Sequence, residues 1–209
     1  MVAKKIPGRP STYDDAKGAI TAAALALFAT KGFDATSVND IAKAAALPKA
    51  NVLYYFGDKE TLWKHCIDEQ WHVVDAFFRQ TLPHPLPATR QGLEQICEAF
   101  MLACCRFPPY VQIPAIEGNI NSWRSDYLAV HHVRRHVDII HSYIVRLMEK
   151  GIVASVEPLF LQTLMTGGGQ LLIGQAELWA SATGVDTRSE EFARRYAKQV
   201  IEVIAPTNF

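Results

Sequence analysis

The sequence lacks the motifs of several large protein classes. It contains no Gly-x-Ser-x-Gly elbow, phosphate-binding glycine loop, dinucleotide-binding fingerprint or paired metal motif. No apolar run reaches the roughly 18 residues that span a bilayer, and the N-terminus has no apolar segment typical of a secretion signal. These absences favour a cytoplasmic protein without a membrane segment, a cofactor or an enzymatic activity.

The sequence also gives little support for a disulfide, a redox-sensing pair or a metal site. The four cysteines show neither a disulfide framework nor zinc-site spacing: Cys66, Cys97, Cys104 and Cys105. Cys104 and Cys105 point in different directions on a helix, so buried, reduced thiols are favoured over a redox-sensing pair. His132 and His136 have a spacing that can share a metal. No cysteine or carboxylate stands at a matching position nearby, so a solvated basic face with Arg135 is favoured and no metal is predicted.

What the chain does have is apolar content and an uneven distribution of charge. It has 209 residues, 49% of them hydrophobic, which is enough for one or two cores. Residues 1–65 carry nine Lys and Arg against six Asp and Glu, whereas residues 66–209 carry twelve against fifteen. This distribution suits a DNA-contacting domain over residues 1–57, followed over residues 58–209 by a domain that does not touch DNA.

Two short helices are predicted within residues 36–65. Ser37 and Asp40 have the spacing of a capping box, in which each side chain binds the other residue's backbone N–H. Pro48 suits the first position of the second helix because its missing N–H would be unpaired there. Val52 and Phe56 then face inward at i and i+4. The two helices together form a helix-turn-helix.

The outward face of the second helix suits a DNA groove. It carries Lys49, Ala50, Asn51 and Tyr54. Lysine donates to guanine acceptors and asparagine pairs with adenine, so Lys49 and Asn51 are predicted to contact bases. Side chains predicted to hold phosphates are Ser37, Tyr54, Tyr55 and Lys59. Upstream, Lys4, Lys5 and Arg9 form a basic arm that either contacts a minor groove or is a solvated tail.

Residues 16–65 resemble the N-terminal DNA-binding domain of the TetR family of transcriptional repressors. The matching positions are Ile20, Ala23, Ala24, Leu27, Phe28, Lys31, Gly32, Phe33, Thr36, Ile41, Ala42, Ala45, Leu47 to Phe56 and Asp58 to Leu62. Ala46 departs from the usual turn glycine, so this turn either avoids positive φ or is strained. Leu53 stands where the family often has tyrosine, and the Leu-Tyr-Tyr-Phe sequence is similar to the RutR-like, pyrimidine-responsive branch.

The second half of the chain shows helical periods and no convincing strand pattern. Helices are expected near residues 89–107, 110–118, 125–150, 157–182 and 188–204. The fold class expected is therefore all-α, with a three-helix helix-turn-helix domain and a C-terminal helical domain. Each helix-interior glycine at 167–169 and 174 costs roughly 1 kcal/mol relative to alanine. A partner helix, a ligand or a kink should offset that cost.

The resemblance implies that the C-terminal domain binds a small effector and forms a homodimer through its last two long helices. Residues combining apolar walls with polar groups are candidates for the effector site: Phe100, Cys104, Asn119, Trp123, Tyr127, His131 and Gln170. The RutR-like branch implies a pyrimidine or a similar small ring. The predicted function is a ligand-responsive regulator, most simply a repressor that a small molecule releases from its double-stranded DNA operator.

Two other function classes remain open from the sequence. One is a helical enzyme that processes a small molecule, and the other is a helical interaction module without DNA contact. In the second case Lys49, Asn51 and Tyr55 would have no role. Binding to duplex DNA that weakens steeply with salt distinguishes a regulator from both.

Overall fold

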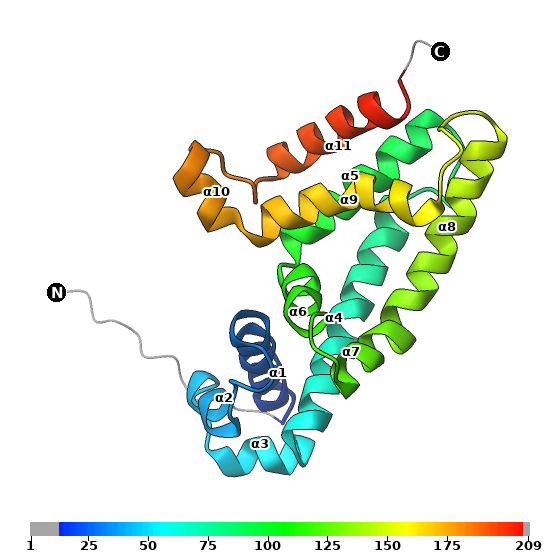
Figure 1. Ribbon diagram of the computed structural model, residues 1–209. Helices are drawn as coiled ribbons and strands as arrows, with labels where there is room; N and C mark the ends of the chain where they lie inside the picture. The colour runs from blue at the N-terminus through cyan, green and yellow to red at the C-terminus, as the bar shows by residue number, and fades with distance from the viewer. Residues whose placement is uncertain (1–12, 207–209) are drawn as a thin grey trace. The chain divides into compact units, whose positions relative to one another are not determined.

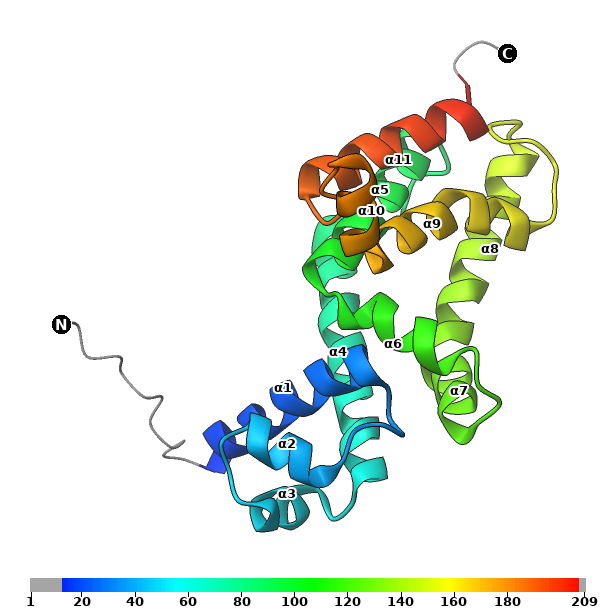
Figure 2. The same cartoon turned by 60° about the vertical axis from the view of Figure 1, so that its left-hand side comes forward.

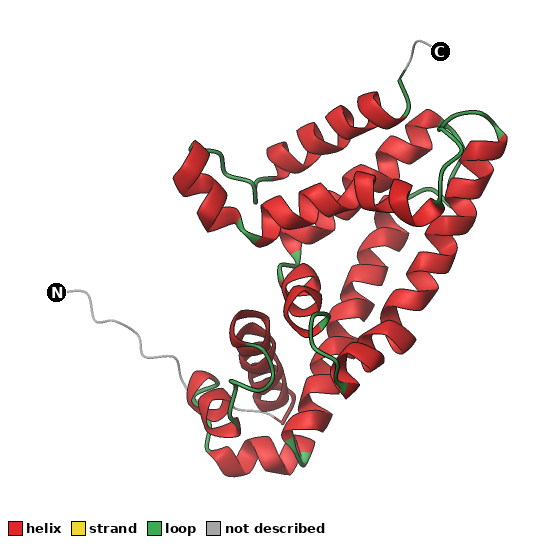
Figure 3. Ribbon diagram, in the orientation of Figure 1, coloured by secondary structure: helices red, strands yellow, loops and turns green. Residues whose placement is uncertain are grey.

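The computed structural model of the protein describes residues 13–206, and the basic arm with Lys4, Lys5 and Arg9 lies outside this range. All regular structure within the range is helical (Figure 3), so the all-α prediction is confirmed. None of the helices described is long and apolar enough to cross a membrane. Figure 1 labels the helices, which are α1 (Tyr13–Lys31), α2 (Val38–Ala44), α3 (Lys49–Phe56), α4 (Lys59–Thr81), α5 (Arg90–Arg106), α6 (Pro109–Glu117), α7 (Trp123–Leu128), the π-helix η1 (Ala129–Val133), α8 (Arg134–Glu149), α9 (Pro158–Gly174), α10 (Ala176–Thr183) and α11 (Glu190–Ile204).

The chain divides into two compact units, and the division falls within α4. The first unit ends at Gln70 and the second begins at Trp71, whereas the sequence suggested a boundary after residue 57. The first half of α4 contributes fully buried side chains to the first unit: Leu62, Trp63, Cys66 and Ile67. The Cys66 thiol also lies 3.6 Å from the carbonyl oxygen of Thr21 in α1. Residues 58–70 therefore complete the core that the helix-turn-helix needs.

The core of the first unit forms where α1, α2, α3 and the start of α4 bury their apolar faces. In α1 the fully buried positions Ile20, Ala24 and Phe28 recur every four residues, which places them on one side of the helix. Val52 and Phe56 of α3 are buried as the sequence predicted, with 1% and 6% of their surface exposed. This packing fixes which side of α3 faces solvent.

The turn between α2 and α3 is strained. Ala46 adopts φ of +54°, in the left-handed region that costs a residue with a Cβ about 1–2 kcal/mol. Of the two alternatives that the sequence allowed, the strained turn is therefore the one adopted. Pro48 is the N-cap of α3, with φ −60° and ψ 145°, and Lys49 is the first helical residue. The prediction placed Pro48 one position too far into the helix.

In the second unit, two of the expected helices are interrupted. The segment expected as one helix over residues 125–150 comprises α7, the π-turn η1 and α8. The segment expected over 157–182 breaks at Gln175, which separates α9 from α10. The other expected helices appear as α5, α6 and α11, with Pro114 inside α6.

The core of the second unit depends on close packing of α5, α9 and α11, which lie against one another in Figures 1 and 2. A Cβ on Gly169 would overlap the end of the Met101 side chain from α5. One on Gly168 would lie 2.6 Å from the hydroxyl oxygen of Tyr196 in α11. Close approach of two partner helices is therefore what offsets the helical cost of these two glycines.

Candidate nucleic-acid interface

The solvent-facing side of α3 carries the residues that the sequence predicted for DNA contact. Lys49, Ala50 and Tyr54 are exposed, and Tyr54 has 77% of its surface accessible. Asn51 and Tyr55 are partly exposed. The Tyr54 and Tyr55 rings meet edge to face, with centroids 5.2 Å apart. One short helix thus presents a cation, an amide and a phenol together.

Ser37 is the N-cap of α2, the helix that precedes α3. The Ser37 hydroxyl accepts a hydrogen bond from the Asp40 N–H at 3.1 Å and donates one to Asp40 Oδ2 at 2.7 Å. The Ser37 N–H donates to the same carboxylate, which completes the predicted capping box. These hydrogen bonds hold the pKa of Asp40 below its usual range. A phosphate contact by Ser37 would compete with this cap.

The Lys59 side chain makes hydrogen bonds within the first unit. Its ammonium donates to the carbonyl oxygens of Phe33 at 2.9 Å and Thr36 at 3.0 Å. It also lies 4.0 Å from the centroid of the Phe33 ring, within cation–π range. The side chain therefore ties the start of α4 to the segment between α1 and α2. A phosphate contact would have to use the ammonium N–H that does not donate to these carbonyls.

A chain of aromatic contacts crosses the second unit. The Phe100 ring meets Tyr110 at 6.2 Å, and Tyr110 meets Trp71 of α4 at 5.3 Å. Trp71 contacts His132 at 5.0 Å, and His132 lies 5.8 Å from Tyr127. The Tyr127 ring in turn lies 4.3 Å from that of His131, and the two are tilted. Three predicted effector-site residues, Phe100, Tyr127 and His131, are thus linked through rings that the prediction did not include.

His136 makes a contact that the sequence did not reveal. Its Nε2 lies 2.8 Å from Asp75 Oδ1, and both side chains are about 30% exposed. The two residues are 61 positions apart, so spacing along one helix gave no signal. The expected solvated basic face is therefore wrong for His132 and His136, both of which are partly buried and contact α4 residues. Within residues 13–206, no cluster of three or more potential metal ligands occurs.

The other predicted effector-site residues are more scattered. Cys104 is fully buried in a core cluster with Met101 and Val111. Asn119 and Gln170 are exposed, and the Asn119 amide donates to the Ala115 carbonyl. A cavity of about 150 Å³ lies between the end of α4 and α5, lined by Thr81, Gln95, Glu98, Ala99 and Leu102. It shares no residue with the predicted set and is smaller than usual ligand sites, which measure about 300–1,000 Å³.

All four cysteines are free thiols. Burial raises the pKa of Cys66 and Cys97 to about 12 and that of Cys105 to about 11. The thiolate is the reactive form, so these side chains are poor nucleophiles near neutral pH. Their environments favour the packing interpretation over redox sensing.

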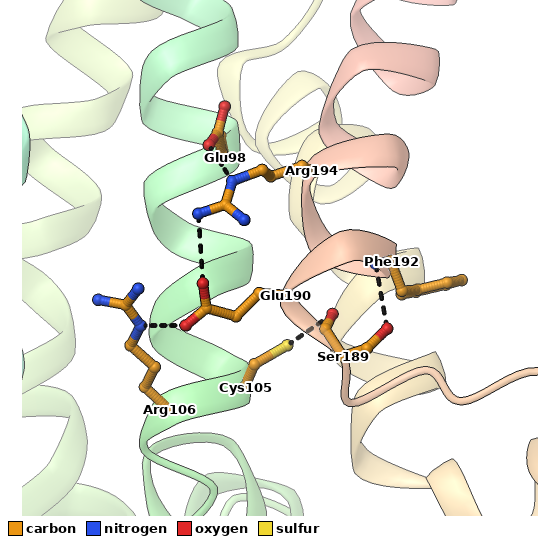
Figure 4. A network of polar contacts seen from close by, with 7 residues as sticks. All are labelled: Glu98, Cys105, Arg106, Ser189, Glu190, Phe192 and Arg194. Carbon is orange, nitrogen blue, oxygen red and sulfur yellow. Dashed lines mark hydrogen bonds and ion pairs between the residues drawn. The ribbon is translucent and has the colours of Figure 1, made fainter.

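An ionic network attaches α11 to α5 (Figure 4). Arg106 Nε lies 2.7 Å from Glu190, and Arg194 bridges Glu190 at 3.2 Å and Glu98 at 3.1 Å. The hydrogen bond from Arg106 lowers the pKa of Glu190. Ser189 caps α11 beside this network, as its hydroxyl accepts from the Phe192 N–H. The network links α11 to α5 at the protein surface.

An apolar surface remains exposed on α9 and α10. It consists of Phe160, Leu164, Leu171 and Leu178, each 52–61% exposed, which we term the α9 stripe. Leu178 lies beyond the break at Gln175, whereas the α9 residues Phe160, Leu164, Gly167, Leu171 and Gly174 follow steps of four and three. This is the spacing of a helix face that packs along another helix. Leu161, Met165 and Ile173 form the opposite, buried face of α9.

Comparison with known proteins finds a family match within the first unit. Residues 20–66 match the family described as "Bacterial regulatory proteins, tetR family". This region of the chain is similar to that family. The match covers α2 and α3 completely, most of α1 and the start of α4.

Two regulators show sequence similarity to this chain. One is the biofilm operon icaADBC HTH-type negative transcriptional regulator IcaR of Staphylococcus epidermidis, 25% identical over 123 residues. The alignment covers 57% of this chain and 65% of IcaR. The other is the HTH-type transcriptional regulator EthR of Mycolicibacterium smegmatis, 35% identical over 96 residues, 44% of each protein. The chain thus spans less than two thirds of the length of either relative.

Solved structures of regulators share the whole fold. The ketosteroid transcriptional regulator KstR2 of Mycobacterium tuberculosis superposes with a TM-score of 0.70 at 18% identity, covering 98% of this chain and 99% of KstR2. The fatty acid degradation regulator FadR from Bacillus halodurans gives 0.65 at 15% identity, covering 95% and 97%. These similarities extend the shared architecture to the C-terminal helical unit.

Proposed function

We propose that the protein is a ligand-responsive, DNA-binding transcriptional regulator, most simply a repressor. The observation that carries the proposal is the exposed face of α3, where Lys49, Asn51 and Tyr54 lie on a helix whose other side is buried. An α-helix fits the major groove of B-form DNA, and these side chains match base edges and phosphates chemically. The tetR-family match of the same segment supports this assignment.

We divide the contacts into base recognition and phosphate binding. Lys49 and Asn51 contact bases, whereas Ser37, Tyr54, Tyr55 and Lys59 hold phosphates. Asn51→Ala should cost about 1–3 kcal/mol of binding free energy on the best operator and relax the preference at one base pair. Tyr54→Phe should weaken all sequences to a similar, smaller extent. Equal, sequence-independent losses from both substitutions would refute this division.

The test of DNA binding itself is a titration of random and selected duplexes at several salt concentrations. Affinity should fall steeply with salt because bound cations displace counterions from the phosphates. Lys59→Ala should flatten that dependence, but it also removes the contacts with Phe33 and Thr36. Its unfolding must therefore be measured alongside. An affinity for duplex DNA that does not change with salt would refute the proposal.

The regulator acts as a homodimer in this proposal. The α9 stripe supports it, because a large exposed apolar surface on a helix indicates a protein interface, and a second copy supplies an identical stripe. Two α3 helices would then contact half-sites about 34–36 Å apart, or at a multiple of that spacing, on a near-palindromic operator. A monomer in sedimentation at micromolar concentration, with and without DNA, would refute the dimer.

A small molecule bound within the second unit controls the affinity for DNA in this proposal. The aromatic chain through Phe100, Tyr127 and His131 supports a flat ring as ligand, and pyrimidines are the first compounds to test because of the RutR-like Leu-Tyr-Tyr-Phe sequence. Helix α4 belongs to both units, so it provides continuous structure between them. The ligand shifts the equilibrium only if it binds one state more tightly.

Reciprocity gives a decisive measurement for this control. A coupling of about 1–3 kcal/mol would change operator affinity about 5- to 150-fold, and the operator must change ligand affinity by the same factor. The ligand is sought by thermal shift and then titrated with and without operator DNA. Equal ligand affinity in both titrations would eliminate the mechanism, however tight the binding.

A further inference from the structure

Within residues 15–70, the large hydrophobic side chains that are exposed lie on α3. Among the side chains described between residues 15 and 70, the exposed ones of this kind are Leu53, 41% accessible, and Tyr54, 77% accessible. A single exposed leucine needs no explanation on most surfaces. Here, however, both residues lie on the helix proposed to enter the DNA groove. The core needs neither, because Val52 and Phe56 supply the buried face of α3.

Leu53 has an apolar neighbour on the same face. Ala50 lies three residues earlier, is exposed, and is therefore adjacent to Leu53 on the helix surface. At about 100° per residue, Leu53 and Asn51 lie about 160° apart around α3. The solvent face of the helix thus has one edge with Leu53 and Ala50, beside Lys49, and another edge with Asn51.

We propose that Leu53, with Ala50 beside it, contacts the C5-methyl group of a thymine in the operator and so determines sequence specificity. In the major groove, the thymine methyl is the apolar group that distinguishes this base, and small or aliphatic side chains pack against it. The inference rests on the proposed DNA binding and adds a base preference to it. Since the two edges of α3 are separated, the thymine occupies a different base pair from the one contacted by Asn51.

Replacing thymine with uracil tests this contact, because it removes one methyl group and keeps every hydrogen-bonding group of the base. Operators are selected from a random duplex pool with the full chain, and each thymine is then replaced singly. We expect uracil at one position of a half-site to weaken binding about fourfold, as for the loss of one buried methyl group. The same replacement should leave the affinity of Leu53→Ala unchanged.

Two further variants make the result specific. Leu53→Met keeps an apolar side chain of similar reach and should retain the uracil effect. Asn51→Ala should bind more weakly overall yet retain the same fourfold ratio, because it lies on the other edge. Selected operators without a shared thymine, or a uracil effect of equal size in Leu53→Ala, would overturn the inference alone. Failure to bind any duplex in a salt-dependent manner would overturn the proposed function as well.

Discussion

The two units of this protein expose different kinds of apolar surface. In the first unit, large exposed hydrophobic side chains are limited to Leu53 and Tyr54 on α3 among those described. In the second unit, Phe160, Leu164 and Leu171 repeat along one side of α9, and Leu178 is exposed on α10. One surface is small and mixed with polar groups, and the other is long and apolar.

This difference suggests two different partners. Alternation of Lys49, Asn51 and Tyr54 with small apolar groups suits the edges of base pairs, which carry donors, acceptors and methyl groups side by side. The α9 stripe lacks these donors and acceptors, and it suits packing against another apolar helix. The experiments below test the two surfaces and the cores that hold them, from the largest expected effect to the smallest.

Disruption of the α9 stripe should produce the largest effect. Leu164→Glu places a charge at the centre of the stripe and should yield a monomer in sedimentation velocity. Affinity for an operator with two half-sites should then fall about 10²- to 10⁴-fold, because the second half-site no longer benefits from linkage to the first.

Ile139→Glu is the matched control for this substitution. Ile139 is 54% exposed on α8, so it introduces the same charge at a similarly exposed apolar position outside the stripe. It should leave both the mass and the DNA affinity unchanged. If the Leu164→Glu protein remained a dimer, the α9 stripe would not be the dimer interface.

The second unit also buries a charge pair, whose loss should rank next. Arg124 Nε lies 2.6 Å from Glu117 Oε2, with side chains 6% and 1% exposed. Arg124→Ala leaves a buried carboxylate without this partner and should lower the free energy of unfolding by about 3–5 kcal/mol. Arg188→Ala removes an exposed pair with Glu177 and should cost at most about 1 kcal/mol. If both variants lost a similar free energy of unfolding in urea, burial would not be what makes the Arg124–Glu117 pair important.

A pair of glycine substitutions contrasts the two units. A Cβ on Gly92 in α5 would overlap the carbonyl oxygen of Pro87 and approach the Tyr143 hydroxyl within 2.8 Å. Gly92→Ala should therefore destabilise the protein by about 1–3 kcal/mol. Gly18 in α1 has open space around it, so Gly18→Ala should stabilise by up to about 1 kcal/mol. Thermal unfolding that shifts in the same direction for both would refute this contrast.

The smallest effect is expected at the strained turn. Ala46→Gly should stabilise the first unit by up to about 1 kcal/mol, because the left-handed penalty of about 1–2 kcal/mol exceeds the extra entropy cost of glycine. Ala45, with φ of −77°, provides the control, and Ala45→Gly should destabilise. Chemical unfolding followed by tryptophan fluorescence, to which Trp63 of this unit contributes, reports both changes. Stabilisation by Ala45→Gly would show that the turn geometry is not the cause.

Local signals allowed much of the first unit to be predicted. The capping box at Ser37 and Asp40 and the buried pair Val52 and Phe56 depend on residues three or four positions apart, and the structure contains them all. The exposed face of α3 follows from the same periodicity. Its proposed contacts with DNA remain predictions, since no nucleic acid is part of the structure.

The sequence by itself determined the all-α class, the helix-turn-helix and the existence of unusual glycines in α9. Only the tertiary structure decided what those glycines meet, which is Met101 from α5 and Tyr196 from α11. It also paired His136 with Asp75 and attached Lys59 to the carbonyls of Phe33 and Thr36. The physical reason is range. Helix capping and periodicity act within one or two turns, whereas these contacts join segments that come together only when the cores form.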